Sequence, residues 1–216
     1  MRSTDRLKTK LPLDFRHIGS EMNHPANPSP PDPLSGGRSA FSGANPRPFV
    51  VWLTGVSGAG KSTLASLLKL QLDALGHRTY LLDGDTLREG LNRDLGFSDA
   101  DRRENIRRTA EVARLMTDAG FIVIAALISP FADARAQARA RFAPGTFVEV
   151  FVDVALEVAE ARDPKGLYVL ARRGTIQQFT GIGSPYEQPE SPEVHVRTAE
   201  ASPDACVAEI MRQLPL

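Results

Sequence analysis

The sequence predicts an α/β fold, a three-layer α/β/α sandwich built around a mostly parallel sheet. Short apolar, β-branched runs alternate with segments of helical periodicity from Pro48 onward, which is typical of parallel α/β architecture. The run over 121–128 is apolar throughout, as in a parallel strand that is covered on both faces. A glycine-rich turn at 55–60 joins the first apolar run to the first helical segment, so a strand, a tight loop and a helix are expected in that order.

The elements follow from periodicity and from start and stop signals. Leucines on one stripe define the first helix, which Gly76 ends, and Ser98 is the N-cap of the next helix. The strands are expected at 49–54, 79–82, 121–128, 147–152 and 194–196. The helices are expected at 61–75, from Ser98 to about Ala119, 132–141, 155–162 and 203–214.

Two segments have no such periodicity. Residues 1–47 hold seven of the sixteen prolines and several glycines, and they predict a disordered Pro/Gly-rich N-terminal tail. A docking arm for a partner, or a misplaced translation start, is the alternative for this tail. Residues 163–192 are rich in glycine, proline and polar residues and predict a long ordered loop, of which about 163–187 form a lid. A single domain over 48–216 is therefore expected.

Composition excludes several classes of function. Basic and acidic residues balance at 26 each, so no general attraction to nucleic acid or to an anionic membrane is expected. The longest apolar run is far shorter than the ~20 residues of a membrane-spanning helix. Cys206 is the only cysteine, which excludes an intrachain disulfide, and the four histidines show no metal-ligand spacing. These observations indicate a cytoplasmic location.

One motif carries phosphate chemistry. Residues 55–62 fit the pattern G-x-x-x-x-G-K-[ST] of a P-loop, between a buried strand and a helix. Glycines let the backbone N–H groups point inward as an anion nest, Lys61 is expected at the β- and γ-phosphates, and Ser62 on Mg²⁺. A chance glycine-rich turn is the alternative. The ATP-binding residues expected are Gly55, Val56, Ser57, Gly58, Ala59, Gly60, Lys61, Ser62 and Thr63.

Carboxylates and cations follow the second strand. Asp83 and Asp85 suit Mg²⁺ coordination and orientation of an acceptor hydroxyl, although Asp-Gly also favours a plain Asx turn. Arg102 and Asn105 share a helix face, where a guanidinium could clamp an anionic acceptor. For most of the arginines between 88 and 108, interspersed acids favour a solvated charged face instead. Phe97 could stack on a base, or pack in the core.

Several blocks together resemble the adenylyl-sulfate kinase (APS kinase) family of P-loop kinases. Residues 82–92, 94–98 and 101–108 are similar to the family's pattern, and so are 128–131, 163–168, 179–182 and 185–187, in the family's order. The resemblance covers about 48–200 and implies transfer of the ATP γ-phosphate to the 3′-hydroxyl of adenosine 5′-phosphosulfate, with PAPS and ADP as products. Sulfate assimilation is the expected setting. The alternatives are another small-metabolite or nucleotide P-loop kinase, or a non-catalytic ATP-binding regulatory module.

The resemblance also implies roles for individual residues. The catalytic residues would be Lys61, Asp85 and Ser129, and the metal-binding residues Ser62 and Asp83. A phosphoserine intermediate is sometimes assigned to the position of Ser129, but in-line transfer between two bound substrates needs no covalent relay. The substrate-binding residues would be Asp85, Arg88, Phe97, Arg102, Asn105, Ile128, Ser129, Lys165 and Phe179. ATP and adenylyl sulfate are the expected substrates, and a homodimer and a contact with ATP sulfurylase stay open.

Overall fold

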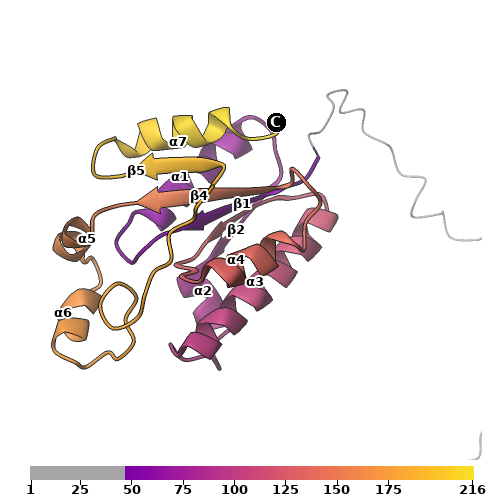
Figure 1. Cartoon of the computed structure of the whole chain (residues 1–216). Helices are drawn as coiled ribbons and strands as arrows, with labels where there is room; N and C mark the ends of the chain where they lie inside the picture. Colours follow the sequence, from indigo (N-terminus) through magenta and orange to yellow (C-terminus); the bar gives the residue numbers. More distant parts are fainter. Residues whose placement is uncertain (1–46) are drawn as a thin grey trace, which may run out of the picture. The chain divides into compact units, whose positions relative to one another are not determined.

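The computed structural model describes residues 47–216 (Figure 1). The predicted disordered tail, apart from its last residue, lies outside the described residues. Five parallel strands form one sheet in the order β2-β3-β1-β4-β5. The strands are β1 (Val50–Thr54), β2 (Thr79–Asp83), β3 (Ile122–Ala126), β4 (Phe147–Asp153) and β5 (Val194–Arg197). The helices are α1 (Lys61–Ala74), α2 (Gly84–Glu89), α3 (Asp99–Asp118), α4 (Ala132–Arg139), α5 (Leu156–Arg162), α6 (Leu167–Arg172) and α7 (Pro203–Arg212).

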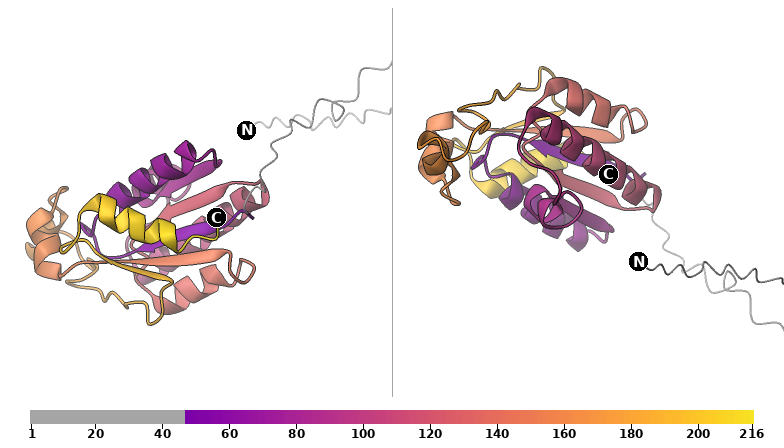
Figure 2. Two further views of the ribbon diagram at one scale, coloured as in Figure 1. Left: turned by 90° about the horizontal axis from the view of Figure 1, so that it is seen from above. Right: turned by 90° about the horizontal axis from the view of Figure 1, so that it is seen from below.

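Helices cover both faces of the sheet, which confirms the predicted three-layer sandwich. Alternation along β1 decides which residues meet which layer. Val51 and Leu53 pack in one apolar cluster with residues of α1 and α7, whereas Val50 and Trp52 pack in a second cluster with residues of α3 and α4. Figures 1 and 2 show α1 and α7 on one side of the strands and α3 and α4 on the other.

Two short helices were not predicted. Gly84 and Asp85 are poor helix formers, so α2 depends on a cap: the Asp83 carboxylate accepts a hydrogen bond from the Asp85 amide at 2.9 Å. In α6, the Asp163 carboxylate accepts from the amides of Leu167 and Tyr168, at 2.8 and 3.0 Å. Both helices have only six residues, too few for a periodic pattern to stand out in the sequence.

The predicted boundaries are otherwise close to those observed. The main difference is the strand expected over 121–128, which forms only over Ile122–Ala126. The last residues of that apolar run leave the sheet and lead into Ser129, which has a positive φ of 39°, and then into Pro130. Because all strands run in parallel, the carboxyl ends of β1, β2, β3 and β4 gather at one edge of the sheet. Within residues 47–216, no helix is long and apolar enough to cross a bilayer.

Candidate active site

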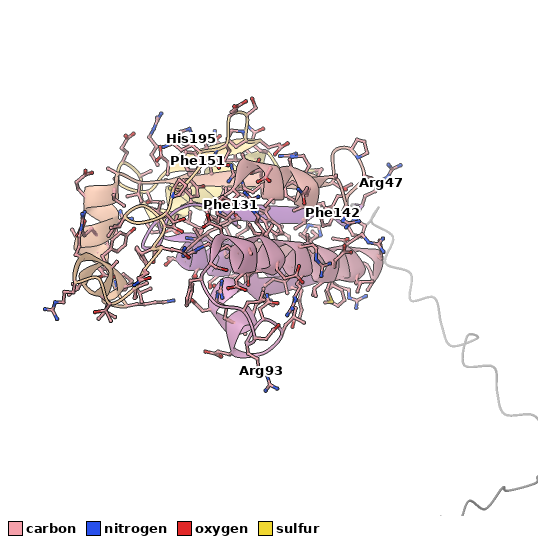
Figure 3. The ribbon with its side chains drawn as sticks, turned by 60° about the horizontal axis from the view of Figure 1, so that its bottom comes forward. Arg47, Arg93, Phe131, Phe142, Phe151 and His195 are labelled. Carbon is pink, nitrogen blue, oxygen red and sulfur yellow. The ribbon has the colours of Figure 1, made fainter. Side chains whose placement is uncertain are left out.

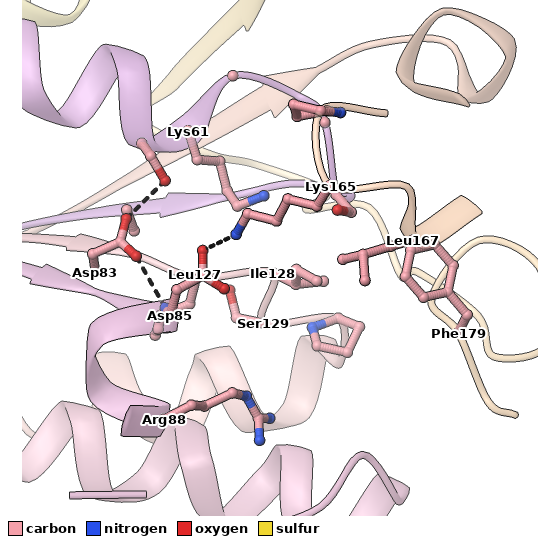
Figure 4. A pocket seen from close by; sticks show the side chains of 18 of the residues that line it. Lys61, Asp83, Asp85, Arg88, Leu127, Ile128, Ser129, Lys165, Leu167 and Phe179 are labelled. Atoms are coloured by element: carbon pink, nitrogen blue, oxygen red, sulfur yellow. Dashed lines mark hydrogen bonds and ion pairs between the residues drawn. The ribbon is translucent and has the colours of Figure 1, made fainter. Parts of the chain in front are cut away.

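A cavity of about 1030 Å³ opens at the carboxyl edge of the sheet (Figure 4). Segments far apart in the sequence line it: the loop before α1, the end of β2 with α2, the start of α3, the turn after β3, and the segment after α5. Its volume lies at the upper end of the range of about 300–1,000 Å³ that is usual for small-molecule pockets. The expected site residues that line it are Ser57, Gly58, Gly60, Lys61, Ser62, Thr63, Asp83, Asp85, Arg88, Phe97, Arg102, Asn105, Ile128, Ser129, Lys165 and Phe179.

The predicted P-loop curls between β1 and α1. Gly58 has a φ of 73°, and a Cβ there would lie 2.8 Å from the carbonyl oxygen of Ala159, so a side chain is excluded by both strain and space. Gly60, with a φ of 98°, is the N-cap of α1 and turns the chain into the helix. The expected Gly55, Val56 and Ala59 belong to the same turn but are not among the residues that line the cavity. The loop therefore presents the amino end of a 14-residue helix to the cavity.

Lys61 lies along the inside of this loop. Its ammonium donates to the carbonyl oxygens of Gly55 at 2.9 Å and Val56 at 2.7 Å. Burial lowers the pKa of Lys61 from 10.5 to about 8, and the carboxylates of Asp83 and Asp85 oppose that change. The ammonium is thus held by weak, neutral acceptors in a desolvated place, where a triphosphate would be a stronger partner.

Ser62 and Asp83 meet beside the loop. The Ser62 hydroxyl donates to Asp83 Oδ2 at 2.7 Å, while the other carboxylate oxygen of Asp83 caps α2 (Figure 4). The Asx turn considered as an alternative in the sequence analysis is therefore present, as the bond by which Asp83 caps α2. Asp85 lies two residues further on, in the first turn of α2, and pairs with Lys165 from the segment after α5. All four of these expected residues line the cavity: Ser62, Asp83, Asp85 and Lys165.

Two arginines and an aromatic ring also line the cavity. Arg88 donates to the carbonyl oxygens of Leu95 and Gly96 at 3.2 and 3.0 Å, and its guanidinium lies 4.5 Å from the Phe97 ring centre. Arg102 is only 5% exposed and donates to the carbonyl oxygens of Phe97 and Gln178, at 3.0 and 2.9 Å. Burial lowers the pKa of both guanidiniums, as expected for cations withdrawn from water.

Phe97 itself is 54% exposed and lines the cavity, so the core-packing alternative is wrong. The other arginines of this region do form a solvated charged face. Arg103 pairs with Asp133, Arg107 with Glu104, and Arg108 with Glu104 and Asp94, all away from the cavity. The alternative favoured by spacing is thus confirmed for these three and wrong for Arg88 and Arg102.

The turn after β3 forms the floor of the cavity. Ser129 is buried, and its hydroxyl accepts a hydrogen bond from the Trp52 indole nitrogen at 3.2 Å. Its carbonyl oxygen accepts from Arg135 at 2.8 Å. These contacts hold the residue in its left-handed conformation, beside Ile128.

The segment predicted as a lid contacts both sides of the cavity. Tyr168 of α6 donates to the carbonyl oxygen of Ser57 in the P-loop at 2.9 Å. Phe179 packs edge-on against Tyr168, with ring centres 4.9 Å apart, and lines the cavity. With the Lys165–Asp85 pair and the Arg102 contact to Gln178, this segment touches the loop, α2 and α3. It is not a plain loop, because α6 lies within it.

Arg162 and Thr198 are among the cavity residues that were not predicted. Arg162 at the end of α5 donates to the hydroxyl and carbonyl oxygens of Thr198, at 3.0 and 2.7 Å, and the Thr198 hydroxyl donates to the carbonyl oxygen of Ala59 at 2.8 Å. Both line the cavity on the side of the P-loop. No motif marks them, because their proximity depends on β5 pairing with β4 at the edge of the sheet.

Comparison with known proteins gives a consistent result. The sequence profile of the family described as adenylylsulphate kinase matches residues 47–197. An adenylyl-sulfate kinase of Burkholderia ambifaria is 86% identical over 168 residues, which is 78% of this chain and 93% of that protein. The bifunctional enzyme CysN/CysC of Xylella fastidiosa is 55% identical over 177 residues, 82% of this chain but 28% of that protein. The structure of the Mycobacterium tuberculosis APS kinase CysC in complex with AMPPNP and APS has a TM-score of 0.75, at 48% identity, covering 78% of this chain and 98% of that one.

Proposed function

The chain belongs to the adenylylsulphate kinase family, and we propose that the cavity at the carboxyl edge of the sheet is where it carries out that family's reaction. The chain is an ATP-dependent kinase that transfers the γ-phosphoryl group to the 3′-hydroxyl of adenosine 5′-phosphosulfate and forms PAPS and ADP. The observation that carries the proposed location is the lining of the cavity, which combines a triphosphate loop with the buried Arg102, the partly buried Arg88 and the exposed ring of Phe97.

The donor half consists of residues 55–63. Backbone amides of the loop and the amino end of α1 bind the ATP phosphates, and Lys61 turns from its two carbonyl partners toward the β- and γ-phosphates. A phosphate oxygen carries a full charge where a carbonyl carries a partial one, so the exchange of partners is favourable. Arg162 and Thr198, beside the loop, contribute to the same half.

The residues fit a Mg²⁺ ion. Ser62 and Asp83 offer hard oxygen donors that already lie in contact, and Mg²⁺ commonly takes one or two protein oxygens, with phosphate and water completing its shell. When bound, Mg²⁺ offsets negative charge on the β- and γ-phosphates.

The acceptor half consists of Arg88, Phe97, Arg102 and Asn105, with Ile128 and Ser129 as its floor and Phe179 opposite. The adenine of adenylyl sulfate stacks between Phe97 and Phe179, and the two guanidiniums and the amide bind its phosphosulfate and ribose region. Both guanidiniums are fixed by backbone carbonyls before the acceptor arrives, so little ordering remains to oppose binding.

Asp85 acts on the acceptor hydroxyl. Its carboxylate lines the cavity, where it orients the 3′-hydroxyl and accepts its proton. Lys165 pairs with this carboxylate and moves with the lid as the acceptor enters. Ser129 acts as a pocket residue, because its hydroxyl is engaged by Trp52 and an in-line transfer between two bound substrates uses no covalent relay.

The lid of about 163–187 closes over both substrates. The lid contacts Ser57, Asp85 and Arg102, so it touches both halves of the cavity. Its closure therefore depends on whether a substrate is bound in each half. A closed lid excludes water, which would otherwise accept the phosphoryl group and waste ATP.

The experiment is to follow label from γ-labelled ATP into product with adenylyl sulfate, its 3′-deoxy analogue, AMP or gluconate as acceptor. We expect label on the ribose of adenylyl sulfate alone, and none with the 3′-deoxy compound. Efficient labelling of gluconate or AMP would contradict the proposal and favour another small-metabolite kinase. Binding of ATP without transfer to any acceptor would favour a regulatory module.

The proposal extends to partners and location. Because a relative joins this kinase sequence to further sequence in a bifunctional enzyme, a contact with ATP sulfurylase is a candidate interaction for this chain. A homodimer is the proposed oligomeric state, which light scattering of the purified protein tests. Because ATP is the donor, we place the reaction in the cytoplasm, and Mg²⁺ as cofactor is checked by loss of turnover with a chelator and its recovery with added Mg²⁺.

A further inference from the structure

The loop between α2 and α3 has one side chain that points inward. Asn92 is fully buried, whereas its neighbour Arg93 is exposed and projects away from the fold (Figure 3). The backbone N–H of Asn92 donates to the backbone carbonyl oxygen of Leu87 at 2.8 Å. The backbone carbonyl oxygen of Asn92 accepts from the backbone N–H of Leu95 at 3.0 Å. These bonds fix the backbone of Asn92 between α2 and the segment that carries Phe97.

The side chain of Asn92 bonds to a residue of the acceptor half. Its Nδ2 donates to Asn105 Oδ1 at 2.9 Å. Its own Oδ1 is buried and has no hydrogen-bond partner among residues 47–216. Asn92 does not line the cavity, whereas Asn105 does. The bond therefore links a core residue to a ligand-facing one.

The direction of this bond follows from which polar group is left unpaired. If both amides were turned, Asn105 Nδ2 would donate to Asn92 Oδ1, and the Asn92 NH₂ group would be buried without an acceptor. An unpaired buried donor costs more than an unpaired carbonyl oxygen and is rarer in folded proteins. The arrangement with Asn92 as donor is thus the favoured one.

That direction decides what Asn105 presents to the cavity. With its Oδ1 engaged by Asn92, Asn105 has its NH₂ group left for a ligand, and no partner for that group is found in the described part of the chain. Arg88 and Arg102 line the same wall, so three donors converge there. A wall of donors suits an anion, and a turned Asn105 would place a carbonyl oxygen against it instead.

We infer that Asn92 is a positioning residue, which holds the Asn105 amide in the orientation that donates to the anionic part of the acceptor. This inference rests on the proposed function, because it names the group that orients one residue of the proposed acceptor half. Asn92 touches no substrate and acts only through Asn105.

The test compares N92A and N92D with the control R93A. N92A removes the side-chain NH₂ group that donates to Asn105. N92D keeps the shape of the side chain, but its ionised carboxylate can only accept, so the Asn105 side-chain amide would turn to donate to it. We expect the KM for adenylyl sulfate to rise about tenfold to hundredfold in both, the range of a lost hydrogen bond to a charged group. N92D should be at least as impaired as N92A. The KM for ATP and kcat should change little, and R93A should match the wild type.

A double variant separates positioning from packing. If Asn92 acts through Asn105, N92A/N105A should be no worse for adenylyl sulfate than N105A alone. If the increases in KM for adenylyl sulfate of N92A and N105A multiply in the double variant, the inference is overturned. It is also overturned if N92A raises the KM for ATP as much as the KM for adenylyl sulfate. A milder effect of N92D than of N92A would also overturn it, since a packing role favours the residue of equal shape. Failure of the proposed function looks different, because wild type and R93A would then also lack acceptor-dependent turnover.

Discussion

The two halves of the cavity are built in different ways. The donor half is nearly continuous in sequence, residues 55–63, and offers mainly backbone amides and one helix end. The acceptor half draws on α2, the loop after it, α3, the turn after β3 and the lid, and it offers side chains. Three of those side chains are hydrogen-bonded to other residues: Arg102 to two backbone carbonyls, Asn105 to Asn92, and Ser129 to Trp52.

The difference explains what each half can recognise. A nest of amides binds any triphosphate, because it reads charge and curvature only. Convergent guanidiniums, an amide and a stacked ring read one particular anionic nucleotide. Substitutions in the donor half should therefore stop all turnover, whereas those in the acceptor half should act on one substrate.

The largest effect is expected at Lys61. Lys61→Ala removes the cation at the transferring group and should lower kcat by about a thousandfold or more, as for loss of a preorganised transition-state donor. Circular dichroism should show an intact fold. Lys69→Ala is the matched control, because Lys69 pairs with Asp73 on the exposed side of α1 and should leave turnover unchanged. Substantial turnover by the Lys61 variant would contradict its role.

Asp85 is the next most sensitive position. Asp85→Asn removes the proton acceptor and should lower kcat by about a hundredfold to ten-thousandfold. Loss of the pair with Lys165 is a competing explanation, so Lys165→Ala is measured beside it. If the two variants lose kcat equally, Asp85 acts through the pair and not on the hydroxyl.

Arg102 tests the independence of the two halves. Arg102→Ala should raise the KM for adenylyl sulfate by about tenfold to hundredfold through loss of a charged hydrogen-bond donor, with little change for ATP. Arg103→Ala is the control on the same helix, since Arg103 pairs with Asp133 on the surface. An unchanged acceptor KM and kcat in the Arg102 variant would remove Arg102 from the site.

The smallest effect is a proton linked to ATP binding. Burial lowers the pKa of Lys61 to about 8, and a bound triphosphate raises it, so the ammonium is regained on binding. Calorimetry in buffers of different ionisation enthalpy should show proton uptake at about pH 8.5 and much less at about pH 6.5. The Lys61→Met variant lacks the titrating group, so the proton uptake that Lys61 contributes on ATP binding should be absent. Equal uptake by this variant and the wild type would assign the proton elsewhere.

The same pKa fixes a pH dependence of stability. Lys61 loses its proton near pH 8 when folded and near 10.5 when unfolded, so the unfolded chain binds more protons between these values. The free energy of unfolding contributed by Lys61 should therefore rise as the pH increases from about 8 to about 10.5, by at most about 3 kcal/mol. Urea denaturation of wild type and Lys61→Met across that range measures it, and a parallel pH profile for the two would contradict it.

The phosphate loop could be predicted from its own residues, whereas the acceptor residues were named mainly through the resemblance to a family. The loop could be found because its chemistry depends on consecutive residues, and the sheet because apolar runs alternate with helical stripes. Asn92, Arg162 and Thr198 carry no such pattern, because their partners lie in other elements and proximity arises only when the sheet orders its strands. α2 and α6 were missed since single capping carboxylates, and not periodicity, define them.

The most direct test of the two-half cavity is the rate of ADP release from ATP by the intact wild-type protein, with and without adenylyl sulfate. The structure predicts slow release from ATP alone, because the hydroxyl that Asp85 serves is absent, and release matched by an equal amount of PAPS once adenylyl sulfate is added. Release at the same rate in both mixtures would show that no acceptor half operates beside the phosphate loop.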